Sequence, residues 1–177
     1  MSDAERRPGS GRYAHWERER RFLMADLPDG LQDPREIADL YLVGTTLRLR
    51  RVQRDGSVDL KLTQKVRPDP SDPSAVRITN TYLTEAEFAL LAGLGGRLLT
   101  KTRWTWPDSP YAIDQFHGDL AGLVLAEVEL EEDEVVPDPP GALAEVTADD
   151  RFSGGSLASM SSHDLEAALR SIRPPST

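Results

Sequence analysis

The sequence contains no cysteine, few aromatic side chains and no long apolar run. Its 177 residues include no cysteine and only 6% aromatics. The first absence excludes disulfide bonds, thiolate zinc sites and cysteine nucleophiles. No stretch reaches the roughly 18 consecutive apolar residues that a membrane helix needs, and the start of the chain lacks a signal-peptide pattern. We therefore expect a soluble cytoplasmic protein.

Basic residues are in the minority as well. The chain has 21 Lys and Arg against 30 Asp and Glu, and its formal net charge of −9 argues against a general nucleic-acid or membrane-surface binder. Most of the basic residues fall in strand-like segments of the first two thirds, so the net charge leaves a local anion site open. With 38% hydrophobic residues, the chain is long enough for one domain with a real core.

Hydrophobic periodicity predicts eight strands and one clear helix in the body of the chain. We expect a flexible leader over residues 1–12, a barrel over 13–136, and a helical tail of the same domain over 137–177. The helix begins after Thr84, where Glu87 completes a capping box, and ends at Gly95-Gly96. A last amphipathic helix is expected over residues 163–172. The predicted strands are residues 13–24, 35–43, 45–52, 58–66, 75–83, 98–106, 111–117 and 124–131.

Two of these strands, far apart in sequence, carry acidic residues on one face. A strand alternates its side chains, so Glu17, Glu19 and Arg21 share a face near the start of the chain. Glu127 and Glu129 alternate with apolar residues near the last strand's end. Taken alone, each could be an exposed edge strand studded with charge. Together they indicate a polar interior that collects carboxylates, which are ligands for a divalent cation.

Basic residues recur with the same period on three further strands. A closed antiparallel barrel turns one face of every strand toward a common interior, which would then hold many cations. Burying isolated charges costs several kcal/mol each, so a multiply charged anion such as a triphosphate, balanced by metal ions, explains the pattern. The basic pairs are Arg48 and Arg50, Lys61 and Lys65, and Lys101 and Arg103.

Six ordered motifs resemble one known family. They are Glu17-x-Glu19-x-Arg21, Leu47-Arg48-Leu49-Arg50, Lys61-Leu62-Thr63-Gln64-Lys65, Lys101-Thr102-Arg103, Ile113-Asp114-x-Phe116-x-Gly118 and Ala126-Glu127-Val128-Glu129. In this order they are similar to the CYTH domains, or triphosphate tunnel metalloenzymes, of the small bacterial type. The resemblance covers about residues 13–158.

The resemblance implies an α+β fold: an eight-stranded antiparallel β-barrel, the triphosphate tunnel, with a few flanking helices. It further implies metal-dependent hydrolysis of a small-molecule triphosphate, with Mg²⁺ or Mn²⁺ as cofactor and with neither nucleic acid nor membrane as partner. Because the tunnel-facing positions are almost all charged, we expect inorganic tripolyphosphate as substrate and the tail as a plug at one end. The oligomeric state is left open.

Residue roles follow from the same resemblance. The catalytic residues it implies are Glu17, Glu19, Glu129 and Arg21. The triphosphate-binding residues it implies are Arg48, Arg50, Lys61, Lys65, Arg77, Lys101 and Arg103. The metal ligands it implies are Glu17, Glu19, Asp114, Glu127 and Glu129.

Two departures from the family pattern keep other functions open. Arg21 stands where the family usually has lysine, and arginine cannot lose its proton to act as a base. The fifth strand lacks the glutamates of many members and offers Arg77, Thr79, Asn80 and Thr81 instead. The alternatives are a triphosphate- or polyphosphate-binding protein without turnover, a nucleotide or thiamine triphosphatase, and an adenylate cyclase.

Overall fold

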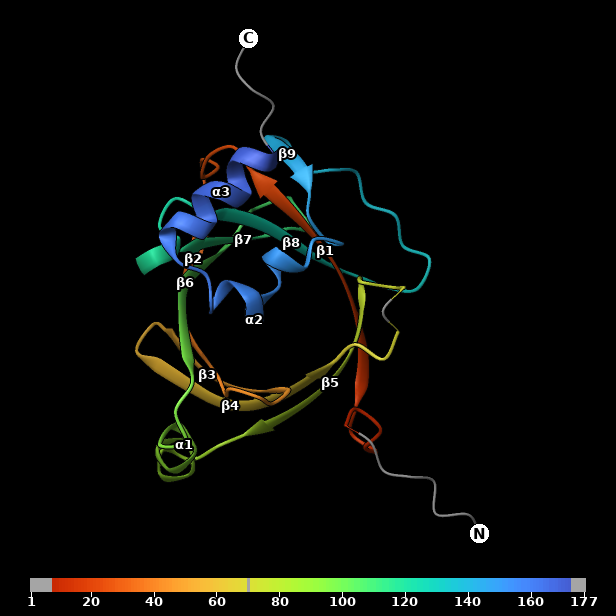
Figure 1. Cartoon of the computed structure of the whole chain (residues 1–177). Helices are drawn as coiled ribbons and strands as arrows, with labels where there is room; N and C mark the ends of the chain where they lie inside the picture. The colour runs from red at the N-terminus through yellow and green to blue at the C-terminus, as the bar shows by residue number, and fades with distance from the viewer. Residues whose placement is uncertain (1–7, 70, 173–177) are drawn as a thin grey trace.

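The chain forms a closed antiparallel β-barrel (Figure 1). The computed structural model describes residues 8–69 and 71–172. Strands follow each other around the barrel in the order β5-β4-β3-β2-β6-β7-β8-β1, and a β5–β1 pairing closes it. The predicted eight-stranded antiparallel barrel is therefore confirmed. Its strands are β1 (His15–Met24), β2 (Gln32–Tyr41), β3 (Leu47–Arg54), β4 (Ser57–Val66), β5 (Ala75–Tyr82), β6 (Arg97–Thr105), β7 (Ala112–Phe116) and β8 (Val124–Leu130).

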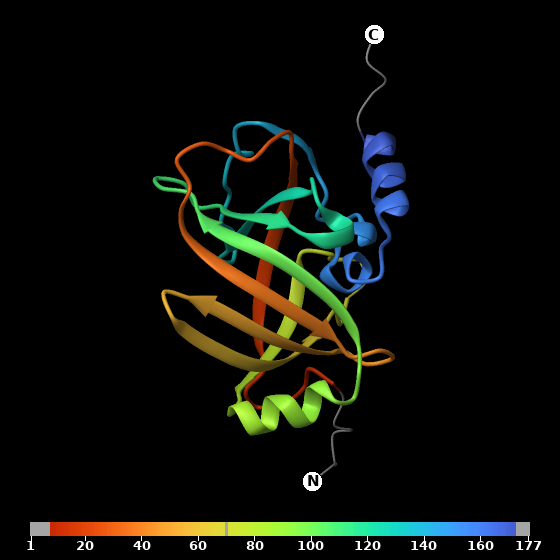
Figure 2. The ribbon, with the colours of Figure 1, turned by 90° about the vertical axis from the view of Figure 1, so that its left-hand side faces the viewer.

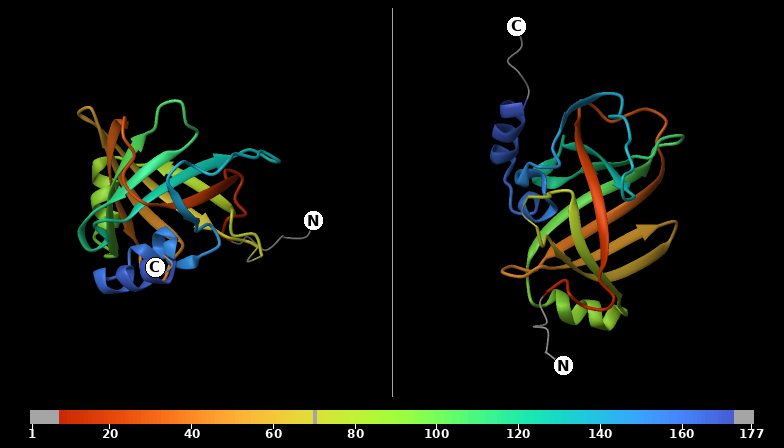
Figure 3. Two further views of the ribbon diagram at one scale, coloured as in Figure 1. Left: turned by 90° about the horizontal axis from the view of Figure 1, so that it is seen from above. Right: turned by 90° about the vertical axis from the view of Figure 1, so that its right-hand side faces the viewer.

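A ninth strand, β9 (Ala142–Glu145), joins the sheet from the tail. Strand β1 spans the barrel wall (Figure 3, right) and pairs with β8 along one side. Along its other side it pairs first with β5, at residues 15–18, and then with β9, at residues 22–24. The sequence predicted only helical pieces in the tail, so β9 was missed. It forms because β5 leaves the second half of β1 with backbone groups that need partners.

The helices lie outside the barrel wall and at one end of it. Helix α1 (Glu85–Ala92) has the predicted capping box of Thr84 and Glu87 and runs outside β3 and β4 (Figure 2). None of its residues is buried. The remaining helices belong to the tail: η2 (Asp150–Phe152), α2 (Gly154–Leu157) and α3 (Ser162–Ile172), while the short η1 (Gly118–Leu120) precedes β8. No helix in the described ranges is long and apolar enough to cross a membrane.

The main apolar cluster closes one end of the barrel. By strand alternation from the charged interior residues, Leu23, Leu99 and Phe116 face inward, and they pack with Phe152 and Leu157 of the tail. A second cluster around Phe22 and Ile113 covers the outer face, where Trp104 and Trp106 pack against it. Because the tail fills only one end, the rest of the interior stays polar.

Candidate functional site

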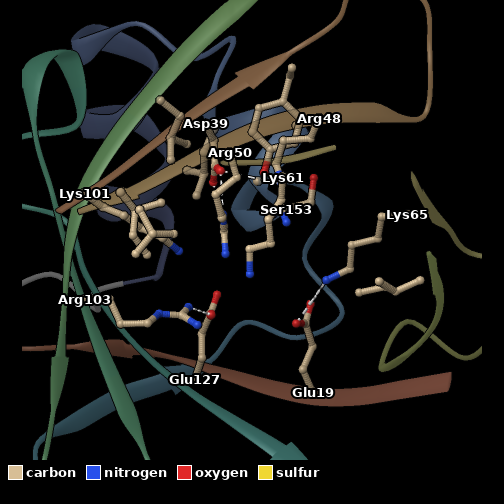
Figure 4. Close-up of a pocket in the computed structure, with 18 of the residues that line it drawn as sticks. Glu19, Asp39, Arg48, Arg50, Lys61, Lys65, Lys101, Arg103, Glu127 and Ser153 are labelled. Atoms are coloured by element: carbon tan, nitrogen blue, oxygen red, sulfur yellow. Dashed lines mark hydrogen bonds and ion pairs between the residues drawn. The ribbon is translucent and has the colours of Figure 1, made fainter. Parts of the chain in front are cut away.

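The barrel interior contains a cavity of about 800 Å³ (Figure 4). It is bounded by charged side chains from the strands and, at the closed end, by residues of the tail. The structure brings together eleven of the thirteen predicted site residues on this surface, and leaves out Asp114 and Arg77. The eleven are Glu17, Glu19, Arg21, Arg48, Arg50, Lys61, Lys65, Lys101, Arg103, Glu127 and Glu129.

One wall of the cavity, formed by β1 and β8, carries the glutamates. Glu19 lies directly opposite Glu129 in the β1–β8 register, and like charges placed this way destabilise a sheet. Burial raises the pKa of Glu129, and the charges of Glu17 and Glu19 raise it further. The Nζ of Lys65 lies 3.1 Å from both carboxylate oxygens of Glu19 and offsets part of this repulsion.

These carboxylates have the chemistry of a site for a hard divalent cation. Glu17, Glu19 and Glu129 offer oxygen ligands only, the donors that Mg²⁺ and Mn²⁺ favour. Their mutual repulsion is the kind that such an ion relieves. In residues 8–69 and 71–172, no three acidic or histidine side chains already converge closely enough to hold an ion. Glu17, Glu19 and Glu129 thus fit a metal in donor type and charge, but not in their spacing in this structure.

Farther along the same wall, Glu127 belongs to a buried ion-pair network. Arg103 donates through Nε and Nη2 to the two oxygens of Asp114, at 2.7 and 2.6 Å, and also through Nη2 to Glu127. Lys101 donates to Asp114 from the other side. Burial alone would raise the pKa of Glu127, but the charges of Lys101 and Arg103 outweigh it and hold that pKa well below its usual range.

Asp114 was predicted to be a metal ligand, but its side chain does not line the cavity. Its side chain is fully buried behind the cations, and both its oxygens accept hydrogen bonds from Lys101 or Arg103. Strand β7 places it directly opposite Arg103, so the cations cover it from the cavity. Asp114 is thus a counter-ion that fixes two cations.

The opposite wall, formed by β2, β3 and β4, carries Arg48, Arg50 and Lys61 together with one carboxylate. Asp39 is 1% exposed and accepts hydrogen bonds from Nε and Nη2 of Arg50 at 2.6 and 2.7 Å. Burial would raise the pKa of Asp39, yet the hydrogen bonds and charge of Arg50 lower it below its ordinary value. Burial also lowers the pKa of Lys61, and Arg50 and Arg48 lower it further.

Sequence reasoning missed Asp39. The predicted second strand alternates only weakly, because Ile37, Asp39 and Tyr41 share the inward face and mix apolar with polar character. The feature that identifies Asp39 is the pairing of β2 with β3, which places it directly opposite Arg50. That register is not visible in single-strand periodicity.

Arg21 lines the cavity but contacts the tail. Its guanidinium donates from Nη1 to the carbonyl oxygen of Phe152 at 2.8 Å and from Nη2 to that of Thr147 at 3.0 Å. The backbone N–H of Arg21 also donates to the Thr147 hydroxyl at 3.0 Å. In place of the predicted catalytic role, the structure gives Arg21 the position of an anchor for the segment that closes the barrel.

Arg77 lies outside the cavity, away from the position expected of a triphosphate ligand. Its guanidinium carbon lies 5.0 Å from the centre of the Trp16 ring, and Nη2 donates to the Ala14 carbonyl oxygen at 3.4 Å. The alternation of β5 is the physical reason. Val76 and Ile78, both buried, take the inward positions on either side of it.

The tail contributes the closed end of the cavity. Ser153, Gly154 and Gly155 line it, and α2 sits inside the ring of strands in the view of Figure 1. Gly154 packs so tightly that an added Cβ would lie 2.0 Å from the Tyr41 hydroxyl. A side chain at this position would therefore require either the Tyr41 ring or the tail to move.

Solved structures similar to this one support the same picture. A crystal structure of NE1496, described as a hypothetical protein, is 29% identical with a TM-score of 0.56, over 82% of this chain and 99% of that chain. A second, described as the inorganic triphosphatase NE1496, is 29% identical with a TM-score of 0.53, over 80% and 93%. No protein-family model and no curated protein matches the sequence.

The structure is a closed antiparallel barrel with clusters of cations and carboxylates facing its interior. This architecture, the six ordered motifs and the likeness to NE1496 agree. The resemblance to the triphosphate tunnel metalloenzyme, or CYTH, family is therefore confirmed.

Proposed function

We propose that the protein hydrolyses a triphosphate in a divalent-metal-dependent reaction, with inorganic tripolyphosphate as its preferred substrate. The observation that carries this is the convergence of Arg48, Arg50, Lys61, Lys65 and Arg103 on one enclosed cavity. Asp39, Glu19, Asp114 and Glu127 offset part of this charge, and a polyanion would balance the remainder. The 29% identity to a protein described as an inorganic triphosphatase supports the reaction.

In this proposal the cations would bind the phosphates and the glutamates would bind the metal. The guanidinium groups of Arg48, Arg50 and Arg103 suit the paired oxygens of phosphates, while Lys61 and Lys65 act as point charges. Glu17, Glu19 and Glu129 would hold Mg²⁺ or Mn²⁺, which when bound would neutralise phosphate oxygens and lower the pKa of an attacking water. Carboxylates on this wall can also accept the proton of that water. No nucleophile of the protein is required.

The closed end supports tripolyphosphate over a nucleotide. A nucleoside has to project from the cavity, and the tail occupies one end of the barrel with Phe152, Gly154 and Leu157. The remaining cavity surface is mainly charged, which suits phosphate better than a base. We therefore expect kcat/KM to be higher for tripolyphosphate than for ATP or thiamine triphosphate.

Phosphate release from these three substrates tests the proposal. The assay runs with Mg²⁺, with Mn²⁺ and with excess chelator, and the expected result is rapid release from tripolyphosphate that the chelator abolishes. A higher kcat/KM for ATP would replace the inorganic substrate with a nucleotide. Formation of cyclic AMP would instead identify a cyclase.

A second candidate, triphosphate binding without turnover, has one observation in its favour. Glu19 is engaged with Lys65, and β5 supplies no glutamate to the cavity, so the carboxylate set is small. A binding protein would show a large rise in melting temperature with tripolyphosphate, a much smaller one with monophosphate at equal ionic strength, and no phosphate release. Equal shifts with both anions would indicate screening alone.

A further inference from the structure

Two arginines of the cavity are held in the same way, each by a buried aspartate on the neighbouring strand. Asp114 lies directly opposite Arg103 and binds its Nε and Nη2. Asp39 lies directly opposite Arg50 and binds the same two nitrogens. The first pair lies within the motifs that indicate the family, whereas Asp39 belongs to none of them.

The geometry of the guanidinium makes this contact directional. Arginine presents five N–H groups in a rigid plane, and Asp39 takes the edge formed by Nε and Nη2. The opposite edge, formed by Nη1 and Nη2, has no other hydrogen-bond partner in the described ranges. Arg50 therefore offers a free two-nitrogen edge, which matches a pair of phosphate oxygens. Figure 4 shows Arg50 extending from Asp39 toward the middle of the pocket.

The neighbouring cations lack this arrangement. Arg48 lies 3.6 Å from Asp39 through Nε, and this nitrogen is buried without a hydrogen bond. The free edge of Arg103 is partly taken, because Nη2 also donates to Glu127. Arg54 also lies near aspartates, but at 3.4 and 3.5 Å and without a hydrogen bond. Among the cavity arginines of the described residues, Arg50 is thus the one that a single carboxylate holds by two hydrogen bonds while its far edge stays open.

We propose that Asp39 is a positioning residue for the triphosphate site: it fixes the plane of Arg50 so that the Nη1 and Nη2 edge faces the phosphate chain. This inference rests on the proposed function for the identity of the anion. It makes a counter-intuitive prediction, because Asp39 is itself an anion in an anion site. If Asp39 acted only through its charge, removing it would tighten tripolyphosphate binding. If it positions Arg50, removing it weakens tripolyphosphate binding.

The test compares two charge-matched variants by calorimetric titration of tripolyphosphate in chelator at constant ionic strength. Asp39→Asn removes the orienting carboxylate. Asp59→Asn removes a carboxylate from the same cavity surface that forms no ion pair with an arginine in the described part of the chain. We expect the dissociation constant of Asp39→Asn to be about 10-fold or more above that of Asp59→Asn, the loss of one charge-assisted contact. Equal constants, or tighter binding by Asp39→Asn, overturn the proposal.

A double-mutant cycle separates positioning from a general structural effect. Arg50→Lys keeps the charge but cannot be held by two nitrogens, so adding Asp39→Asn to it should cause no further loss relative to Asp59→Asn. A penalty that persists in the Arg50→Lys background contradicts the proposal. Should Asp39→Asn fail to fold, Arg50→Lys is compared with Arg48→Lys. Arg50→Lys must lower the affinity for tripolyphosphate more than Arg48→Lys does, and equal losses contradict the proposal.

Binding and turnover together separate this inference from the proposed function. A wild-type protein that binds tripolyphosphate without hydrolysing it refutes the reaction, while the Asp39 effect on affinity still supports positioning. Hydrolysis by the wild type with equal affinities of Asp39→Asn and Asp59→Asn refutes positioning alone. Absence of tripolyphosphate binding to the wild type refutes both.

Discussion

The two walls of the cavity handle buried charge in opposite ways. On the wall of β2 and β3, Asp39 pairs with Arg50 across neighbouring strands, so its carboxylate is neutralised within the protein. On the wall of β1 and β8, Glu19 faces Glu129, and repulsion is left partly uncompensated. The first wall neutralises its carboxylate without a ligand and retains the cations Arg48 and Lys61, whereas the second would be stabilised by a bound cation. Stability and function therefore diverge on β8, where the network-bound Glu127 and the repelled Glu129 stand two residues apart.

The largest expected effect is on activity, from Glu129→Gln. This change keeps the side-chain volume and removes one charge from the repelling set, so metal-dependent phosphate release should fall about 100-fold. The free energy of unfolding in chelator should hold or rise, because repulsion from Glu17 and Glu19 is relieved. Unfolding of the variant in metal-free buffer, or unchanged turnover, would show that Glu129 is not a metal ligand.

Glu127→Gln, two residues away, should affect stability instead. It leaves Arg103 with one partly buried ion-pair partner fewer. Breaking a fully buried pair costs about 3 kcal/mol, so the expected loss is somewhat smaller. Urea denaturation in chelator measures this loss beside Glu129→Gln as the matched control. Equal stability of the two variants would contradict the claim that Glu127 stabilises the fold more than Glu129 does.

The pH dependence of stability should separate the same two residues. The raised pKa of Glu129 means that the folded state holds its proton more tightly, so its stabilising contribution is complete below about 4.5, the ordinary value for glutamate, and is lost as pH rises through the folded pKa. The depressed pKa of Glu127 gives a contribution that is present above that value and is lost as pH falls through the folded pKa.

In terms of variants, the benefit of Glu129→Gln should fade as pH falls toward 4.5, and the penalty of Glu127→Gln should fade only at lower pH. Denaturation curves at pH 7, 5 and 4 in chelator measure both differences. Parallel pH profiles for the two variants would contradict the assigned pKa directions.

The smallest effect is expected outside the cavity. Arg77→Ala removes a cation that stacks on Trp16 at the surface, so KM for tripolyphosphate should change less than about twofold, and stability by about 0.5 kcal/mol. Lys65→Ala serves as the comparison within the cavity. A large rise in KM for Arg77→Ala would show that Arg77 contributes to triphosphate binding after all.

Sequence periodicity was sufficient to predict the barrel and most of the residues that face its interior. Where charged and apolar residues alternate along a strand, the alternation shows directly which residues share a face. It failed where the interior is not charged. On β5 the inward residues are Val76 and Ile78, so Arg77 was assigned to the wrong face. On β2 the weak alternation concealed Asp39. The contact between Arg21 and the tail depends on β9 and η2, neither of which has a strong local pattern.

The pairing of β1 has a consequence for how the protein is made. Glu17 and Glu19 leave the ribosome well before their partner Glu129, which follows more than 100 residues later. Until β8 and β5 are both available, β1 has nothing to fix its register, and a slip by one residue would exchange Glu19 for Arg18 or Arg20 inside the barrel. Closure of the barrel and assembly of the proposed metal site are therefore expected to be one folding event, and acquisition of metal affinity by a refolding chain should coincide with it.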